Sequence, residues 1–276
     1  MEFDLYIFLI CSLTMNNPKV IKHIVNWLNS YSKNSKTKGF VIGISGGIDS
    51  AVTSTLCAKT GLKTICIEMP IFQSKEELER SKNHISWLKS NFNNVESLHI
   101  DLTNSFSELE KTISDSNNPN NYLALANTRS RLRMATLYYY ASINNCLVVG
   151  TGNKVEDFGV GFYTKYGDGG VDLSPIADLM KSEVRSIGKE MGIINEIIVA
   201  KPTDGLWDDT RSDEDQIGAS YSELEWAMHE LNKGKNVSNF SGREKEVFEI
   251  LKKFNTANNH KMIPIPICKI TNDQKV

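Results

Sequence analysis

The residue types best suited to chemistry lie at residues 43–50, Gly-Ile-Ser-Gly-Gly-Ile-Asp-Ser. An apolar, β-branched run at residues 40–44 predicts a buried strand, and residues 51–59 are able to continue as a helix. The paired glycines allow a sharp turn close to a ligand, and the free N–H groups at the start of a helix point at one spot. A strand, a glycine turn and a helix N-terminus together predict an anion-binding site.

Asp49 indicates which anion chemistry this loop supports. The common phosphate loop carries a lysine after its glycines, whereas here a carboxylate stands close to the place of the anion. A carboxylate repels a polyphosphate unless a cation lies between them. We therefore interpret Asp49 as a Mg²⁺ ligand, with the hydroxyls of Ser45 and Ser50 and the backbone N–H groups holding phosphate oxygens.

The same residues also fit Gly-x-Ser-x-Gly, the strand-to-helix turn that carries the nucleophile of α/β-hydrolases. Ser45 would then be the nucleophile, and an acid and a histidine, His229 or His260, would follow it in the chain. Against this alternative, the charge of Asp49 disfavours an oxyanion nearby, and the arginines and lysines of the chain would have no role. The motif alone does not decide between the two chemistries.

Glu156 is the second candidate carboxylate, because it follows another predicted strand at residues 146–149. A single loop acid is most often solvated, but parallel strands end at one edge of a sheet, so Glu156 and Asp49 are able to share one Mg²⁺. Arg129 and Arg133 share a helix face and Arg131 points elsewhere, so at least one of the three has a different role from the others. Each is either a solvated surface residue or a residue that recognises a phosphate or carboxylate. Weaker candidates, each more often solvated or turn-forming, are Lys165, Lys181, Asp172, His260 and Lys261.

Strands and helices alternate along the first half of the chain. Apolar runs predict strands at residues 40–44, 64–69, 95–102 and 146–149, and periodic patterns predict helices at 16–35, 50–60, 76–91 and 122–144. This order predicts an α/β fold, a doubly wound parallel sheet with helices on both faces, and a ligand beyond the carboxyl ends of the strands. Later segments predict a functional glycine-rich loop at 164–175, helices at 179–192, 220–232 and 241–257, and an acidic mobile lid at 203–215.

Composition excludes several classes of partner. The chain has 276 residues and a formal net charge of −2, so it has no global basic footprint for nucleic acid. The five cysteines are scattered and form no Cys-x-x-Cys pair, which is typical of a reducing, cytoplasmic compartment. The apolar patch at residues 5–13 is too short to span a membrane and lacks the basic start of a signal peptide. We treat residues 1–15 as an N-terminal extension, favouring Met15 as the start of translation, and residues 16–276 as one domain.

Taken together, the motifs resemble those of a known family. Ser45-Gly-Gly-Ile-Asp-Ser50 resembles the pyrophosphate loop of the ATP pyrophosphatase superfamily, which includes the NAD, GMP and asparagine synthetases and tRNA-thiolating enzymes. The motifs at residues 127–134, 150–156, 165–172, 173–181, 201–203 and 260–261 are, in this order, similar to those of the NAD synthetase family. The resemblance covers roughly residues 16–262 and implies a Rossmann-like fold of the adenine nucleotide alpha hydrolase type. Two departures are Ser130, where the family usually has alanine, and the acidic segment 208–215; residues 1–14 match nothing in the family.

The resemblance also implies roles for individual residues. Asp49 and Glu156 would hold Mg²⁺, and Asp49 and Lys181 would be catalytic. The implied ATP site comprises Gly43, Ile44, Ser45, Gly46, Gly47, Ile48, Asp49, Ser50, Thr151, Lys181 and Thr203. The implied deamido-NAD⁺ site comprises Arg131, Lys165, Asp172, His260 and Lys261. The family is homodimeric, with the dinucleotide partly across the subunit interface.

The implied reaction joins ammonia to deamido-NAD⁺ through an acyl adenylate made from ATP, giving NAD⁺, AMP and pyrophosphate. Some family members add a glutamine-hydrolysing domain, but the synthetase resemblance uses nearly all of this chain, so we expect ammonia to be the nitrogen source. The alternatives are a GMP synthetase-like enzyme on the same loop, a nucleotide sensor without catalysis, and the Ser45 hydrolase.

Overall fold

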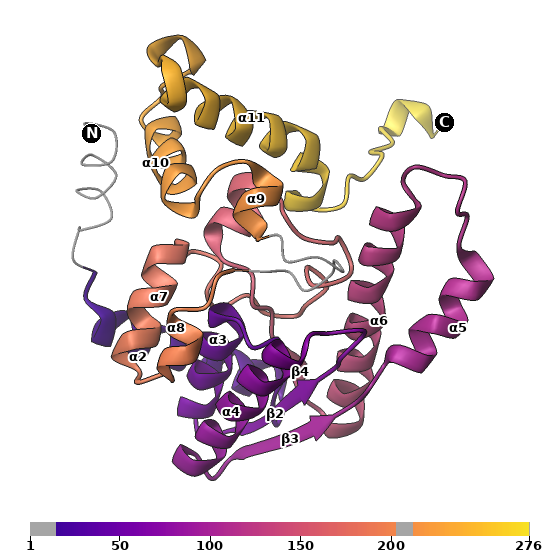
Figure 1. The fold of residues 1–276 in the computed structure, drawn as a ribbon, viewed down its shortest axis with the longest axis vertical. Helices are drawn as coiled ribbons and strands as arrows, with labels where there is room; N and C mark the ends of the chain where they lie inside the picture. The colour runs from indigo at the N-terminus through magenta and orange to yellow at the C-terminus, as the bar shows by residue number, and fades with distance from the viewer. Residues whose placement is uncertain (1–14, 203–211, 276) are drawn as a thin grey trace.

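The computed structural model describes residues 15–202 and 212–275. Its centre is a four-stranded sheet in the order β3-β2-β1-β4 (Figure 1). The strands are β1 (Gly39–Gly43), β2 (Lys63–Glu68), β3 (Val95–His99) and β4 (Leu147–Val148). All neighbouring strands are parallel, so their carboxyl ends lie along one edge. The predicted parallel α/β fold is confirmed.

Alternate side chains of β1 pack into two separate hydrophobic cores. Phe40 and Ile42 pack into one core and Val41 into the other, as the two-residue period of a strand requires. Helices α2 (Asn17–Ser35), α3 (Ile48–Lys59), α4 (Lys75–Asn91), α7 (Lys181–Glu190) and α8 (Asn195–Ile198) contribute to the first core. Helices α5 (Thr103–Ile113) and α6 (Asn121–Asn144) contribute to the second. Both faces of the sheet are therefore covered, as predicted.

A third core lies outside the sheet, in what we call the C-terminal helical region. It consists of α9 (Asp213–Ile217), α10 (Tyr221–Asn232) and α11 (Gly242–Met262), and Figure 1 shows α10 and α11 together above the sheet and its helices. A π-helical turn, Val155–Val160, packs Val155 and Val160 into this third core. The segment that follows β4 is thus held by the C-terminal helical region.

The structure departs from the predicted elements in several places. The predicted strand at 95–102 ends at His99, and β4 keeps only two residues of the predicted 146–149. Helix α5, in which only Phe106 is buried, is absent from the predicted elements. The predicted lid at 203–215 overlaps α9, whose Ser212 cap begins a regular helix.

Several expectations fall on residues outside the described ranges. These are the N-terminal extension at residues 1–14, Thr203 and most of the predicted lid. Of the described cysteines, Cys57, Cys66 and Cys146 are free and buried, as expected for small core residues, and Cys268 is free and exposed. Among the described residues, no helix combines the length and apolar character needed to cross a bilayer.

Candidate active site

The glycine loop between β1 and α3 is organised by its own hydroxyls. The Ser45 and Ser50 hydroxyls lie 3.1 Å apart, and the Gly47 N–H donates to the Ser45 hydroxyl over 3.2 Å. Gly46 has φ +83°, and a Cβ there would stand 2.8 Å from the Glu77 carbonyl oxygen, so only glycine fits. Helix α3 begins at Ile48, earlier than predicted, which places Asp49 in its first turn. The N-terminus of α3 therefore opens onto the carboxyl end of β1, as an anion site requires.

Asp49 and Glu156 meet at the ammonium group of Lys181. Lys181 Nζ lies 2.5 Å from Asp49 Oδ2 and 2.9 Å from Glu156 Oε1. The three side chains come from the first turn of α3, the π-helical turn and the first residue of α7. The Lys181 residue is only 2% exposed. The sequence-based pairing of Asp49 with Glu156 thus agrees with the geometry, and Lys181 supplies the cation between them.

The pKa values of these groups follow from burial and from their mutual contacts. Burial raises the pKa of Asp49, and the charge of Lys181 offsets only part of that rise. Burial also acts to raise the pKa of Glu156, but Lys181 and the Tyr221 hydroxyl outweigh it and hold that pKa below its usual value. For Lys181 burial acts to lower the pKa, and the two carboxylates more than reverse it. The lysine is therefore charged throughout the neutral range.

Asn153 joins the two halves of this arrangement. Its Nδ2 donates to Asp49 Oδ1 over 3.2 Å, and its Oδ1 accepts from the backbone N–H groups of Val155 and Glu156 over 3.1 and 3.2 Å. The side chain is fully buried. One amide therefore orients the Asp49 carboxylate and starts the turn that carries Glu156. Asn153 lies within the motif at residues 150–156, but no role was predicted for it.

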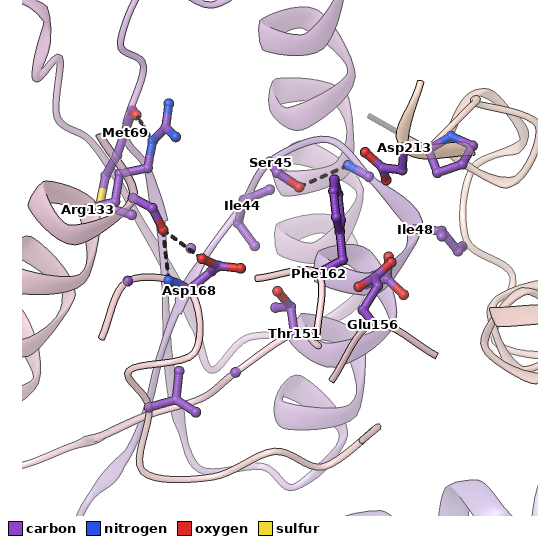
Figure 2. A pocket seen from close by; sticks show the side chains of 18 of the residues that line it. Ile44, Ser45, Ile48, Met69, Arg133, Thr151, Glu156, Phe162, Asp168 and Asp213 are labelled. Carbon is purple, nitrogen blue, oxygen red and sulfur yellow. Dashed lines mark hydrogen bonds between the residues drawn. The ribbon is translucent and has the colours of Figure 1, made fainter. Parts of the chain in front are cut away.

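A cavity of about 260 Å³ opens beside these groups (Figure 2). Of the predicted ATP-site residues, those lining it are Gly43, Ile44, Ser45, Gly47, Ile48, Asp49, Thr151 and Lys181, together with Glu156. Gly46 and Ser50 lie in the loop but not in the lining, and Thr203 is outside the described residues. Neither His229 nor His260 belongs to this lining, so in the described part of the chain Ser45 has no catalytic histidine beside it.

Three of the five predicted deamido-NAD⁺ residues, Arg131, Lys165 and His260, form a second cluster. Arg131 Nε donates to the Lys165 carbonyl oxygen over 3.4 Å, and Lys165 Nζ donates to the His260 carbonyl oxygen over 2.6 Å. Lys261 Nζ donates to the carbonyl oxygens of residues 161 and 163. Asp172 lies apart from these contacts, because its carboxylate accepts from the Val148 N–H and the Tyr138 hydroxyl at the end of β4.

Several acids and one tyrosine at the site escaped the sequence analysis. Asp168 lines the cavity and accepts from the Ser130 hydroxyl over 2.7 Å, and in Figure 2 it lies opposite Glu156 and Asp213. Burial raises the pKa of Asp168. The glycine-rich segment 164–175 was the only signal that would have found it. Asp213 lies within the acidic segment 203–215 but was given no role of its own, and Tyr221 carried no signal, because their contacts with the site depend on the packing of α9 and α10.

The donor set fits a magnesium ion. Mg²⁺ takes oxygen ligands and is often held by one or two carboxylates, completed by phosphates and water. Asp49 and Glu156 already enclose one buried cation, the Lys181 ammonium. Among the described residues no three His, Cys, Asp or Glu side chains gather as an all-protein metal cage. Two carboxylates beside a glycine loop therefore suit an ion that arrives with a polyphosphate.

The fold and the site define an α/β protein of the adenine nucleotide alpha hydrolase type, the type found in NAD synthetases. The family model described as NAD synthase matches residues 20–264, and the chain belongs to this family. An NH(3)-dependent NAD(+) synthetase of Alkaliphilus oremlandii is 36% identical over 262 residues, covering 92% of this chain and 99% of that protein.

Two solved structures are similar over nearly the whole chain. The NH3-dependent NAD synthetase of Campylobacter jejuni, solved with nitrate, has a TM-score of 0.74 and 26% identity, covering 93% of this chain and 100% of its own. An NMN synthetase of Francisella tularensis has a TM-score of 0.78 and 29% identity, covering 94% and 100%. The sequence-based recognition of the family is confirmed.

Proposed function

We propose that this chain synthesises NAD⁺ from deamido-NAD⁺, ATP and ammonia, releasing AMP and pyrophosphate. The relatives named NH(3)-dependent NAD(+) synthetases support ammonia as the nitrogen source. The observation that carries the proposal is the Lys181 ammonium enclosed by Asp49 and Glu156 beside the glycine loop. The loop N–H groups bring positive potential to the place where a polyphosphate would bind, and the two carboxylates, which outnumber the single charge of Lys181, suit a Mg²⁺ ion beside it.

The proposed ATP site is the glycine loop with Thr151, Lys181 and Thr203, and the proposed Mg²⁺ ligands are Asp49 and Glu156. The proposed deamido-NAD⁺ contacts are Arg131, Lys165, Asp172, His260 and Lys261. The cluster of Arg131, Lys165 and His260 supports a common role for three of them. We also propose a homodimer in the cytoplasm; the free, buried cysteines suit a reducing compartment.

The proposed reaction has two steps. An oxygen of the nicotinate carboxylate attacks the α-phosphorus of ATP, and the bond from that phosphorus to the bridging oxygen of pyrophosphate breaks. The nitrogen of ammonia then attacks the carbonyl carbon of the acyl adenylate, the bond to the AMP oxygen breaks, and the nitrogen loses a proton. The chain contributes charge neutralisation and positioning, for which no side-chain nucleophile is required.

Individual residues have distinct tasks in this scheme. The loop N–H groups and the Ser45 hydroxyl bind phosphate oxygens, and Lys181 neutralises the departing pyrophosphate. Bound Mg²⁺ would supply further stabilisation of charge on the phosphates, held by Asp49 and Glu156. Asn153 orients the Asp49 carboxylate and the start of the turn that carries Glu156 through its three hydrogen bonds.

The test is an NAD⁺ assay with ATP, Mg²⁺, ammonium and deamido-NAD⁺. We expect NAD⁺ and pyrophosphate in equal amounts, and no pyrophosphate when deamido-NAD⁺ is omitted. Parallel reactions replace deamido-NAD⁺ by nicotinate mononucleotide, because of the similarity to an NMN synthetase, or by xanthosine monophosphate. Faster turnover of either replacement would overturn the proposed substrate, and glutamine matching ammonium would overturn the proposed nitrogen source.

A further inference from the structure

One face of α10 reaches two parts of the candidate active site. Tyr221 and Glu225 lie four residues apart, so their side chains are neighbours on the same helix face. Both are buried, at 3% and 4% exposure. Figure 1 shows α10 close above α7, the helix that begins with Lys181. Two polar side chains so deeply buried require specific partners, and both find them at the site.

Tyr221 contacts the carboxylate of Glu156. Its hydroxyl donates to Glu156 Oε1 over 2.5 Å and lies 3.3 Å from Asp213 Oδ2. Glu156 Oε1 is also the oxygen that accepts from Lys181. The Lys181 ammonium stands 4.7 Å from the centre of the Tyr221 ring, within the range of a cation–π contact. Tyr221 therefore restrains both the acid and the cation beside it.

Glu225 holds the start of α7. Its two carboxylate oxygens accept from the Ser182 backbone N–H over 2.9 Å and from the Ser182 hydroxyl over 2.6 Å. Ser182 directly follows Lys181, so this bidentate contact determines how the first turn of α7 presents the lysine. A carboxylate at a helix N-terminus is also favoured by the helix dipole. The backbone that carries Lys181 is thus anchored from α10.

We propose that α10 is the positioning element of the site, in which Tyr221 orients the metal-binding carboxylate of Glu156 and Glu225 orients Lys181. Neither residue touches the reacting atoms, so both are positioning residues. The expected effect on the rate of NAD⁺ formation rests on the proposed function, but the two contacts predict separable effects. Tyr221 acts on the affinity for the metal, and Glu225 acts on the rate.

The experiment compares Tyr221→Phe and Glu225→Gln in the full chain, with Tyr31→Phe as a matched control. Tyr31 lies on α2, is 42% exposed and is remote from the site. Binding of Mn²⁺ in the presence of ATP is followed by electron paramagnetic resonance, and NAD⁺ formation gives kcat and KM. Because a partner that orients a metal ligand typically contributes about 10- to 100-fold to metal affinity or activity, we expect Tyr221→Phe to weaken Mn²⁺ binding by about that factor.

Glu225→Gln keeps an oxygen acceptor for Ser182 but removes the charge. We expect kcat to fall by about 10-fold, with Mn²⁺ affinity within about twofold of the unaltered protein. Unchanged Mn²⁺ binding in Tyr221→Phe, or a Glu225→Gln enzyme with unaltered kcat, overturns the assignment for that residue. Mn²⁺ binding needs no deamido-NAD⁺, so the Tyr221 result stands even if the chain forms no NAD⁺, an outcome that would contradict only the proposed function.

Discussion

The two paired carboxylates depend on different parts of the molecule: Asp49 on the sheet and its first core, and Glu156 on a turn that the C-terminal helical region holds. Asp49 follows β1, and its neighbours Ile48, Ala51 and Val52 belong to the first core beside the sheet. Glu156 lies in a turn whose Val155 and Val160 belong to the third core. The site is therefore assembled where two independently packed regions meet, and the geometry between its acids depends on both.

The two acids differ in how far along the sequence the residues that position them lie. The loop around Asp49 is shaped by hydrogen bonds among residues 45–50. The Glu156 carboxylate accepts instead from the hydroxyl of Tyr221, 65 residues away in the sequence. A change in the C-terminal helical region should thus alter metal binding without disturbing the glycine loop, whereas changes in the loop act directly on phosphate binding.

The strongest test of the comparison neutralises each of the two acids in turn. We expect Asp49→Asn and Glu156→Gln each to lower kcat on the order of 1,000-fold, because a shared cation contributes several kcal/mol and each 1.36 kcal/mol is one factor of ten. The fold should survive, since Lys181 keeps one carboxylate partner in either variant. Steady-state kinetics and circular dichroism check both points.

Retained turnover in Asp49→Asn would show that the metal assignment is wrong. A large loss in Asp49→Asn alone, with Glu156→Gln unaffected, would show that the turn held by the C-terminal helical region contributes no ligand. Each outcome identifies which of the two regions supports the chemistry.

The next test removes the cation that joins the regions. In Lys181→Met the two buried carboxylates lose their common partner, and breaking a buried ion pair in this way typically costs about 3–5 kcal/mol. We expect the free energy of unfolding to fall by about that amount without metal and to recover largely when Mg²⁺ is added. Denaturant unfolding at pH 8, with and without Mg²⁺, measures both values.

Lys154→Met is the matched control for that experiment. Lys154 pairs with Asp178, whose side chain is 96% exposed, so the loss should stay below about 1 kcal/mol and should not respond to Mg²⁺. Equal Mg²⁺ responses in the two variants would mean that Asp49 and Glu156 do not form a cation site.

Gly161 tests how tightly the C-terminal helical region holds Glu156. Gly161 has φ +64°, its N–H donates to the Glu156 carbonyl oxygen, and an added Cβ would lie 2.4 Å from Asn258 Cβ on α11. We expect Gly161→Ala to destabilise the protein by about 1–3 kcal/mol beyond the backbone strain itself. Thermal unfolding and kcat should fall together, because the turn carrying Glu156 has to shift.

Gly234→Ala provides the control for backbone strain alone. Gly234 also has a positive φ, of 78°, but no described atom lies near its added Cβ. The free energy of unfolding of Gly234→Ala should fall only by the strain of a left-handed backbone, about 1–2 kcal/mol, and kcat should not change. A Gly161→Ala variant no worse than this control would indicate that the contact with α11 is loose.

The same contrast explains what could be predicted from the sequence. β1, the glycine loop and α3 were predictable because the strand period, the glycine turn and the helix start each depend on residues that are neighbours in the sequence. The pairing of Asp49 with Glu156 followed from one topological rule about strand ends. Tyr221 and Glu225 were not predictable, because their partners lie 65 and 43 residues away and no local pattern marks such contacts. The π-helical turn likewise has no period that single-sequence reasoning detects.

A last prediction concerns acid sensitivity in the sheet region. His84 on α4 is fully buried; its Nε2 pairs with the Ser54 hydroxyl at 2.9 Å, and its Nδ1 has no hydrogen-bond partner among the described residues. Burial lowers the pKa of His84 from 6.5 to about 4. Between these values the unfolded chain binds a proton that the folded chain does not, so stability falls as pH drops below 6.5.

By pH 5.5 that loss amounts to about 1.4 kcal/mol, since one pKa unit corresponds to 1.36 kcal/mol. His84→Gln removes the titrating group, so its unfolding free energy should decrease less between pH 7.5 and pH 5.5 than that of the unaltered protein. Denaturant unfolding at the two pH values measures this difference of differences, which cancels the cost of the substitution itself. Equal decreases in both proteins would show that the acid sensitivity arises elsewhere, and regional hydrogen exchange would then show whether it lies in the C-terminal helical region.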